Sequence, residues 1–264
     1  MTPSTISFTT DYGLSDGFVA ACHGTIARLA PQARLIDVTH LIPPGDIRRA
    51  AAVLAQTAPS FPPAVHLAVV DPGVGTERRP IALSTHGTAG HPSGSLLVGP
   101  DNGLLIPAAE SLGGIATAVH LTNEEWFAPH VSATFHGRDI FAPVAARLAS
   151  GASLLAAGDL IDDVVRLPLP YVEQTPGRLV AEVLTIDQFG NVQLAASPDL
   201  LPLDVLALTV ESVDATRTST FGDAPAGALV LLTDSAGYLA AAVNGGSAAN
   251  LLSLIPGDRV TIIY

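Results

Sequence analysis

The chain has 264 residues, of which 48% are hydrophobic and only 14% are charged, and this composition excludes an intrinsically disordered protein. Its formal net charge of -12 disfavours nucleic acids and anionic membrane surfaces as partners and favours cationic ligands. A chain of this length forms one large domain or two unequal ones. Because so few charges leave little polar surface, we expect an oligomer.

The chain starts without the basic and apolar segments of a secretory signal, and it contains no run of about 18 apolar residues. Its single cysteine, Cys22, is surrounded by apolar residues and is predicted to be a buried, unreactive thiol. These features predict a cytoplasmic protein with no membrane span.

Strand-like and helix-like segments alternate through the first two thirds of the chain. In chain order they are a strand at 6–10, a helix at 16–29, a strand at 34–38, a helix at 46–56, strands at 65–70, 81–84, 95–98 and 116–121, and a helix at 140–150. The segment 88–95, rich in Gly, Ser and Pro, is a predicted hairpin or surface loop. The pattern predicts an α/β domain over residues 1–168, with a mostly parallel sheet sandwiched by helices.

The last third of the chain has a different pattern, without long helical segments. Its β-rich runs lie at 178–186, 205–213, 228–233, 238–243 and 259–264, separated by Gly, Pro, Asp and Ser. We therefore expect a smaller, all-β, barrel-like domain over residues 177–264, joined to the first by a Pro-containing linker near 168–176.

Ligands of open parallel sheets bind beyond the carboxyl ends of the strands, so the polar residues that follow predicted strands are the first candidates. Asp11 and Asp16 lie where the first strand meets the first helix. Asp16 is suited to capping that helix. Asp11, at the strand terminus, is suited to a bidentate grip on a ribose diol.

A second cluster, VVDPGVGTERR at 69–79, joins a buried strand to a glycine loop. Gly73 and Gly75 permit close approach of the backbone to a ligand. The cluster is not a dinucleotide-binding GxGxxG motif, because Arg78 stands at the last glycine position. A salt bridge between Asp71 and Arg78 that braces the loop is the structural alternative to a role in binding.

A third cluster, TFHGRD at 134–139, places His136 beside a glycine and two opposite charges before a helix. A lone histidine is more often structural than catalytic. The other histidines, including His40, His86, His91 and His130, lack metal-ligand spacing, so no metal site is predicted. The nucleophile elbow GxSxG of serine hydrolases is also missing.

In the all-β part, Asp187, Phe189 and Asn191 surround a glycine turn. They form either an ordinary β-turn or a stacking face and an amide that together hold adenine. Ser235 belongs to another polar turn, which by itself is typical of structure rather than binding.

Six segments occur in an order that resembles the S-adenosyl-L-methionine (SAM) hydroxide adenosyltransferases, in the superfamily of the fluorinase and chlorinase enzymes. They are TDYGLSDGF, VVDPGVGTERR, GPDNGLL, TFHGRDIF, IDQFGNV and DSAGY. The resemblance implies hydrolysis of SAM to adenosine and L-methionine, with water or hydroxide attacking the ribose C5′ carbon. It also implies a homotrimer with active sites at the subunit interfaces, and SAM as a substrate without any further cofactor.

By this resemblance, Asp71, Arg78 and His136 would hold the attacking water and Asp11 would grip both ribose hydroxyls. The other substrate-binding candidates that the resemblance implies are Asp16, Asp187 and Ser235 for the methionine end, and Phe189, Asn191 and Phe221 for adenine.

The sequence departs from the halogenase pattern, with His136 and Gly137 at positions of a tyrosine and a serine, Asp71 at another tyrosine and Ala236 at an arginine. These departures disfavour halide capture. The leading alternatives are a SAM-dependent halogenase and a non-catalytic SAM- or adenosine-binding protein, and a metal-dependent phosphohydrolase is a third. A sulfonium leaves as a neutral thioether, so hydrolysis needs neither an acid nor a metal at the leaving group.

Overall fold

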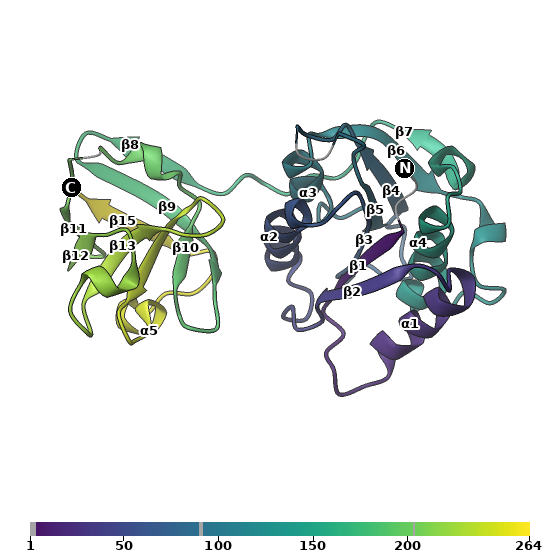
Figure 1. The fold of residues 1–264 in the computed structure, drawn as a ribbon, viewed down its shortest axis with the longest axis horizontal. Helices are drawn as coiled ribbons and strands as arrows, with labels where there is room; N and C mark the ends of the chain where they lie inside the picture. Colours follow the sequence, from purple (N-terminus) through teal and green to yellow (C-terminus); the bar gives the residue numbers. More distant parts are fainter. Residues whose placement is uncertain (1–3, 90–91, 203) are drawn as a thin grey trace. The chain divides into compact units, whose positions relative to one another are not determined.

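The structure is a computed structural model that describes residues 4–89, 92–202 and 204–264. The chain divides into two compact units, the first ending at Leu167 and the second starting at Pro168 (Figure 1). The second unit thus begins earlier than the predicted boundary at 177, because part of the expected linker forms a strand.

The first unit is built on a seven-stranded sheet, within the part of the chain that the structure describes. The strands are β1 (Thr5–Thr10), β2 (Arg34–Thr39), β3 (Val65–Val69), β4 (Pro80–Thr85), β5 (Leu96–Pro100), β6 (Ile115–Leu121) and β7 (Gly158–Ile161). Their order is β2-β1-β3-β5-β4-β6-β7. The first four in this order are parallel neighbours, whereas β4 and β7 run antiparallel to their partners.

Helices cover both faces of this sheet, which confirms the predicted sandwich (Figure 1). The α-helices of this unit are α1 (Phe18–Leu29), α2 (Ile47–Thr57), α3 (Ile106–Ser111) and α4 (Ala142–Ala149), and the shorter turns are η1 (Ala58–Ser60), η2 (Glu124–Trp126), η3 (Gly137–Phe141) and η4 (Leu154–Ala156). α1 and α4 pack in one core cluster and α2 and α3 in another. α1 forms because Val19, Cys22 and Ile26 recur at helical spacing and are buried together.

The sheet has a topological switch point between β1 and β3. The chain leaves β1 through α1 to reach β2 on one side, and then returns through α2 to β3 on the other side of β1. Such a reversal opens a crevice at the carboxyl ends of the two central strands. The segments that follow β1 and β3 therefore lie side by side.

The second unit is a closed barrel. Its elements are β8 (Val172–Thr175), β9 (Arg178–Ile186), β10 (Val192–Leu194), η5 (Pro198–Leu200), β11 (Ala207–Val210), β12 (Val213–Arg217), η6 (Phe221–Asp223), β13 (Leu229–Thr233), β14 (Leu239–Val243), α5 (Ala248–Leu252) and β15 (Arg259–Ile263). β10 pairs with both β14 and β9, and this closes seven strands around an apolar interior. β8 is added outside as an edge strand on β9. The barrel-like prediction is confirmed.

Several local features differ from the sequence prediction. The run 205–213 is split into β11 and β12 by a turn in which Glu211 and Ser212 have φ of 50° and 66°. The expected linker contains β8, and α3, β7, β10 and α5 were not predicted. The predicted loop 88–95 connects the antiparallel pair β4 and β5, although its residues Gly90 and His91 lie outside the described residues.

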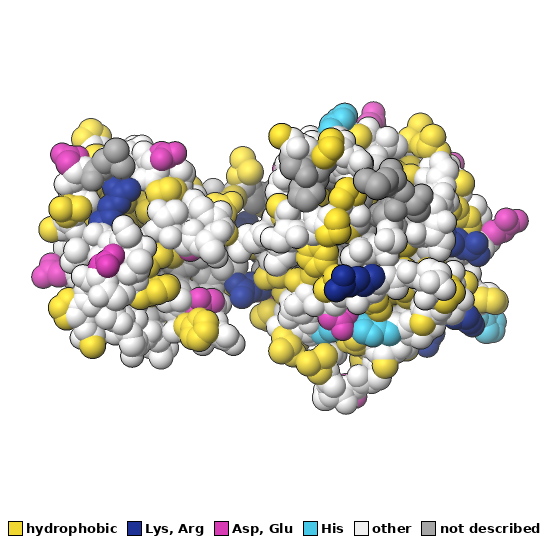
Figure 2. Space-filling view, viewed as in Figure 1, with side chains coloured by type: hydrophobic (Ala, Val, Ile, Leu, Met, Phe, Trp, Pro, Cys, Tyr) yellow, Lys and Arg dark blue, Asp and Glu magenta, His cyan; other side chains and the backbone are white. Residues whose placement is uncertain are grey.

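Cys22 is completely buried and free, and burial raises the pKa of its thiol to about 12. Among the described residues, no helix combines the length and the apolar character needed to cross a membrane. Some large apolar side chains are exposed on the surface of both units (Figure 2). Leu14, Leu41 and Phe189 are each about two-thirds exposed, at 67%, 68% and 67%.

Candidate active site

A pocket of about 150 Å³ lies at the switch point of the first unit. Its walls come from four segments: the residues after β1, the loop before α2, the end of β3 with the residues that follow it, and the residues that lead into and begin η3. The lining residues include Asp11 and Tyr12 from the first segment, Asp71 from the third, and His136 and Gly137 from the fourth. The topology thus brings three of the polar clusters singled out in the sequence to one place.

The loop that follows β3 is held in a compact form by its own hydrogen bonds. Val74 donates its backbone N–H to the Asp71 carbonyl at 3.2 Å, and the Thr76 hydroxyl donates to the Gly73 carbonyl at 2.7 Å. Gly75 has a φ of +75°, and a Cβ there would overlap the Ala133 carbonyl. Glycine is therefore required where this loop packs against the segment that leads to His136.

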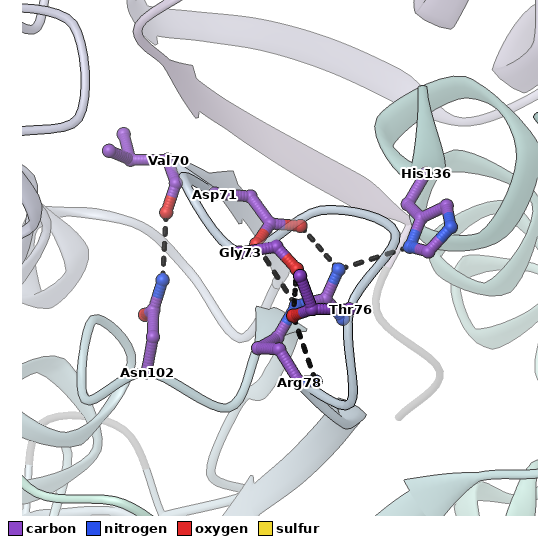
Figure 3. Close-up of polar contacts among 7 residues, drawn as sticks. All are labelled: Val70, Asp71, Gly73, Thr76, Arg78, Asn102 and His136. Atoms are coloured by element: carbon purple, nitrogen blue, oxygen red, sulfur yellow. Dashed lines mark hydrogen bonds and ion pairs between the residues drawn. The ribbon is translucent and has the colours of Figure 1, made fainter. Parts of the chain in front are cut away.

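Asp71, Arg78 and His136 form a continuous chain of contacts (Figure 3). Arg78 Nε donates to Asp71 Oδ1 at 3.0 Å, and Arg78 Nη2 donates both to Asp71 Oδ2 and to His136 Nδ1, the latter at 3.1 Å. The side chains of Arg78 and Asp71 are only 8% and 6% exposed. The bracing salt bridge considered from the sequence is present, and it lies against the pocket.

This contact defines the state of the His136 imidazole. An arginine can only donate hydrogen bonds, so Nδ1 of His136 is the acceptor and the proton of the neutral ring lies on Nε2. Burial lowers the pKa of His136 below 6.5, and the positive charge of Arg78 lowers it further, against the opposing effects of Asp71 and Asp139. His136 is therefore a neutral hydrogen-bond donor at pH 7.

Asp11 and Tyr12 form the opposite part of the pocket. Asp11 Oδ2 accepts the backbone N–H of Gly45 at 2.9 Å, so one carboxylate oxygen is oriented by the loop before α2. Tyr12 packs edge-on against Phe135, and its hydroxyl occupies the space that a side chain at position 137 would need. Burial raises the pKa of Tyr12, so its hydroxyl stays protonated. Tyr12 was not among the predicted site residues, although it belongs to the TDYGLSDGF segment.

Asp16 does not join this pocket. It is exposed, and α1 begins after Gly17 without a side-chain cap, so the capping interpretation of Asp16 is wrong. The helix that is capped by an aspartate is α2, where Asp46 accepts the N–H of Arg49 at 2.9 Å.

In the second unit, Asp187 organises the turn that carries Phe189 and Asn191. Asp187 Oδ1 accepts both backbone N–H groups, each at 2.9 Å, and its Oδ2 accepts the Asn191 side-chain amide at 2.8 Å. The turn interpretation is confirmed by these bonds. Phe189 is exposed, and the bonds of Asn191 to Asp187 use its N–H groups and not its Oδ1.

The two remaining candidates also lie in turns of the second unit. Ser235 belongs to a turn in which Asp234 Oδ1 accepts the N–H groups of Ala236 at 2.9 Å and Tyr238 at 3.0 Å. Phe221 starts the short helix η6 and is 47% exposed. These residues are thus presented to solvent by well-bonded backbone.

Two supports of the pocket were missed because their partners are distant in sequence. Asn102 donates its side-chain amide to the Val70 carbonyl at 2.9 Å, immediately before Asp71 (Figure 3). Arg79 binds the buried Asp101 with Nε at 3.0 Å and Nη2 at 2.6 Å. The segment GPDNGLL, quoted above without a role, supplies both Asp101 and Asn102.

Comparisons with known proteins identify the chains that this one resembles. Family models described as the SAM hydroxide adenosyltransferase N-terminal and C-terminal domains match residues 6–158 and 181–261. A protein of Salinispora arenicola named (R)-S-adenosyl-L-methionine hydrolase is 61% identical over 259 residues, covering 97% of each chain. A fluorinase of Actinoplanes sp. is 29% identical, covering 97% of this chain and 96% of its own. A solved structure of a conserved protein from Thermotoga maritima, 37% identical, covers 98% of this chain and 100% of its own with a TM-score of 0.90.

Proposed function

The chain belongs to the SAM hydroxide adenosyltransferase family, since models of both family domains match it over most of its length, and we propose that it hydrolyses SAM to adenosine and L-methionine. The observation that carries this proposal is the arrangement of Asp71, Arg78 and His136 at a pocket that Asp11 also lines. The 61% identity to a curated SAM hydrolase, against 29% to a fluorinase, favours water over halide as the nucleophile.

In the proposed reaction, a water oxygen attacks C5′ of the ribose from the side opposite to sulfur. The C5′–O bond forms as the C5′–S bond breaks, and the electron pair of that bond stays on sulfur, which leaves as the neutral thioether of methionine. The attacking water then loses a proton, which passes through the Asp71 carboxylate to solvent. No cofactor or metal is needed at the leaving group, and we propose none for this step.

The pocket residues orient the water in this scheme. His136 donates from Nε2 to the water oxygen, and Asp71 accepts one of the water's protons. Arg78 fixes both partners, because it holds Asp71 through two nitrogens and sets the tautomer of His136. Correct placement of the attacking atom contributes as much as about 7–11 kcal/mol to such a reaction.

The ion pair with Arg78 reduces the repulsion by which the Asp71 carboxylate would exclude a halide. Two unpaired negative charges about 4 Å apart repel by roughly 4 kcal/mol at an effective dielectric of 20. Asp71 shares its charge with a buried arginine, so this repulsion is weaker than a lone carboxylate would give. The preference for water over halide then depends on His136 and Asp71. His136 donates a hydrogen bond and Asp71 accepts one, and a water molecule can make both bonds.

Asp11 is proposed to bind the ribose hydroxyls with the carboxylate edge that faces the pocket. A cavity of about 150 Å³ is smaller than the ~300–1,000 Å³ of typical ligand sites. We therefore propose that the pocket holds the ribose and the reacting centre, whereas the adenine and methionine ends are bound by the second unit. In that unit, the residues that would contact adenine are Phe189, Phe221 and Asn191. The residues that would contact the methionine end are Asp187 and Ser235, together with Asp16 of the first unit.

We further propose a homotrimer in which the second unit of one subunit completes the pocket of the next. The exposed Leu14, in the loop after β1, the exposed Leu41, in the loop after β2, and the exposed Phe189 support this, since large apolar side chains are costly to leave in water. A cytoplasmic location remains a prediction from the sequence.

The proposal is tested by incubating the purified, full-length protein with SAM in ¹⁸O-labelled water and analysing the nucleoside by mass spectrometry. Label in the 5′ hydroxyl of released adenosine is expected. A chloride-dependent 5′-chloro product would instead indicate a halogenase, and tight binding of SAM without turnover would indicate a binding protein. Complete loss of hydrolysis in excess chelator, with the protein still folded, would contradict the metal-free step.

A further inference from the structure

A second cluster of ionisable side chains lies outside the pocket, between α1 and the end of β2. His23 of α1 places Nε2 2.9 Å from Oδ1 of Asp37, which belongs to β2. His40, one residue beyond β2, places Nε2 3.1 Å from the same oxygen. One ligand atom from each of the three residues lies within 4.8 Å of the other two.

A shift in strand pairing produces this convergence. In a regular strand, Asp37 and His40 would project from opposite faces, because their numbers differ by three. β1 pairs Phe8 with Asp37 but Thr9 with Thr39, so one extra residue of β2 is accommodated between them. The shift turns His40 to the same face as Asp37, which is the face that α1 covers.

The environment of His40 provides an independent indication of a ligand. Its side chain is only 2% exposed, and Nε2 is buried without a hydrogen-bond partner, since its contact with Asp37 does not have hydrogen-bond geometry. Burying a polar nitrogen in this way is costly unless something binds it. The ring is held in place by Phe8, which packs edge-on at 4.8 Å between ring centroids.

The other nitrogen of His40 has a polar partner that can fix the tautomer a metal ligand requires. Nδ1 lies 2.8 Å from the Thr10 hydroxyl, which also accepts the backbone N–H of Tyr12 at 3.2 Å. With its proton on Nδ1, His40 presents a lone pair at Nε2, directed at Asp37 and His23. Metal-binding histidines commonly have their second nitrogen fixed by a polar partner in this manner.

We propose that His23, Asp37 and His40 bind one divalent transition-metal ion, with zinc as the preferred ion. Two imidazoles and one carboxylate are a common zinc ligand set, in which adjacent ligand atoms lie about 3–4 Å apart around the ion. His23 and Asp37 are partly exposed, at 34% and 42%, so the ion has access from solvent and a water completes its coordination.

The ion would join three elements of the first unit. His23 ties α1 to the cluster, Asp37 and His40 tie the end of β2, and the Thr10 hydroxyl links the cluster to the end of β1. His40 also accepts the backbone N–H of Gly13 through its carbonyl at 2.8 Å. None of the three ligands lines the pocket, and the inference does not depend on the proposed hydrolysis. Its expected consequence is greater stability of this unit.

The test uses untagged, full-length protein that has been stripped with a chelator and dialysed. Zinc binding is measured by calorimetry and by competition with a chromophoric chelator, and cobalt is added separately to detect a visible absorption band. His23→Gln removes one ligand at a partly exposed position. His86→Gln, which changes an exposed histidine outside the cluster, is the matched control.

We expect one zinc ion per chain, bound at least about tenfold more weakly by His23→Gln and equally well by His86→Gln. Zinc should raise the melting temperature of the wild type and of the control but not of His23→Gln. Equal binding by the wild type and His23→Gln, or no stoichiometric binding by the wild type, would overturn the proposal. Circular dichroism of the metal-free proteins checks that His23→Gln is folded, and Asp37→Asn, which keeps the shape of the side chain, should also lose the cobalt band.

Discussion

Arg78 donates a hydrogen bond from Nη2 to Nδ1 of His136, across 58 positions of sequence. The same guanidinium binds Asp71, so one arginine determines both the tautomer of the imidazole and the orientation of the carboxylate. The two groups that would hold the attacking water are thus linked through a single residue.

The first prediction concerns pH. Because the pKa of His136 is lowered in the folded state, the unfolded chain takes up the proton first as the pH falls. The contribution of His136 to stability is therefore fully present above pH ~6.5 and is lost between this value and its lower folded pKa. Hydrolysis should fall over the same acidic range, because protonated His136 can no longer accept from Arg78.

Titration of His136 by NMR checks this prediction, with His136→Gln used to assign the signal. Arg78→Gln should raise the pKa of His136, since it removes the positive charge that disfavours the imidazolium. A His136 pKa above 6.5 in the wild type would contradict the proposed neutral state.

The second prediction concerns Asp71. Asp71→Asn keeps the shape of the side chain but removes its charge, and turnover should fall by about 10²–10⁴-fold with SAM affinity kept within tenfold. Single-turnover kinetics and equilibrium binding separate the two effects. Both variants remove the negative charge that pairs with the buried Arg78, which costs about 3–5 kcal/mol of stability. Asp71→Ala is the poorer test, because asparagine keeps one oxygen acceptor for Arg78 and alanine keeps none. Normal turnover with much weaker binding would remove Asp71 from the reacting centre.

The third prediction assigns the ribose to Asp11. Asp11→Asn should weaken adenosine binding by about 10- to 100-fold, because hydrogen bonds from hydroxyls to a carboxylate are lost or weakened. Asp163→Asn is a suitable control, since Asp163 is exposed and its carboxylate binds Arg79 rather than the pocket. Calorimetry with adenosine measures both variants, and an unchanged affinity in Asp11→Asn would exclude this role.

The fourth prediction uses the close approach of Gly137 to Tyr12. Gly137→Ala should destabilise the protein by about 1–3 kcal/mol, because the new methyl group overlaps the tyrosine hydroxyl. Tyr12→Phe in the same chain should restore part of this loss. Gly24→Ala, in α1 with open space around the added methyl, should instead stabilise by about 0.5–1 kcal/mol. Urea unfolding of the four variants, including Tyr12→Phe alone, tests the series.

The fold could be predicted where the periodicity of the sequence is local. α1 is clear because its apolar residues repeat at helical spacing, and β3 is clear because it is a short run of residues that are apolar except for His66. α3 has only six residues, which is too short a segment to show a clear helical periodicity. β8 is exposed along its whole length and therefore shows no alternation.

The candidate site could likewise be predicted from the sequence only in part. Asp71, Arg78 and His136 lie in segments whose patterns could be read directly, whereas the role of Asn102 depends on a contact with Val70, 32 positions away. The convergence of His23, Asp37 and His40 could not be predicted from spacing, because it requires the irregular pairing of β1 with β2. Long-range contacts and strand irregularities produce no periodic pattern in the sequence, so they cannot be predicted from it.

Because Cys22 is buried, its reactivity can report local opening of the first unit. A thiol with a raised pKa that no reagent can reach is inert until the helix carrying it detaches from the sheet. Since the chain has no other cysteine, the rate at which a maleimide or disulfide reagent couples to the native protein measures how often the first unit opens. Slower coupling in the presence of adenosine would report, without any engineered label, that the nucleoside holds this unit closed.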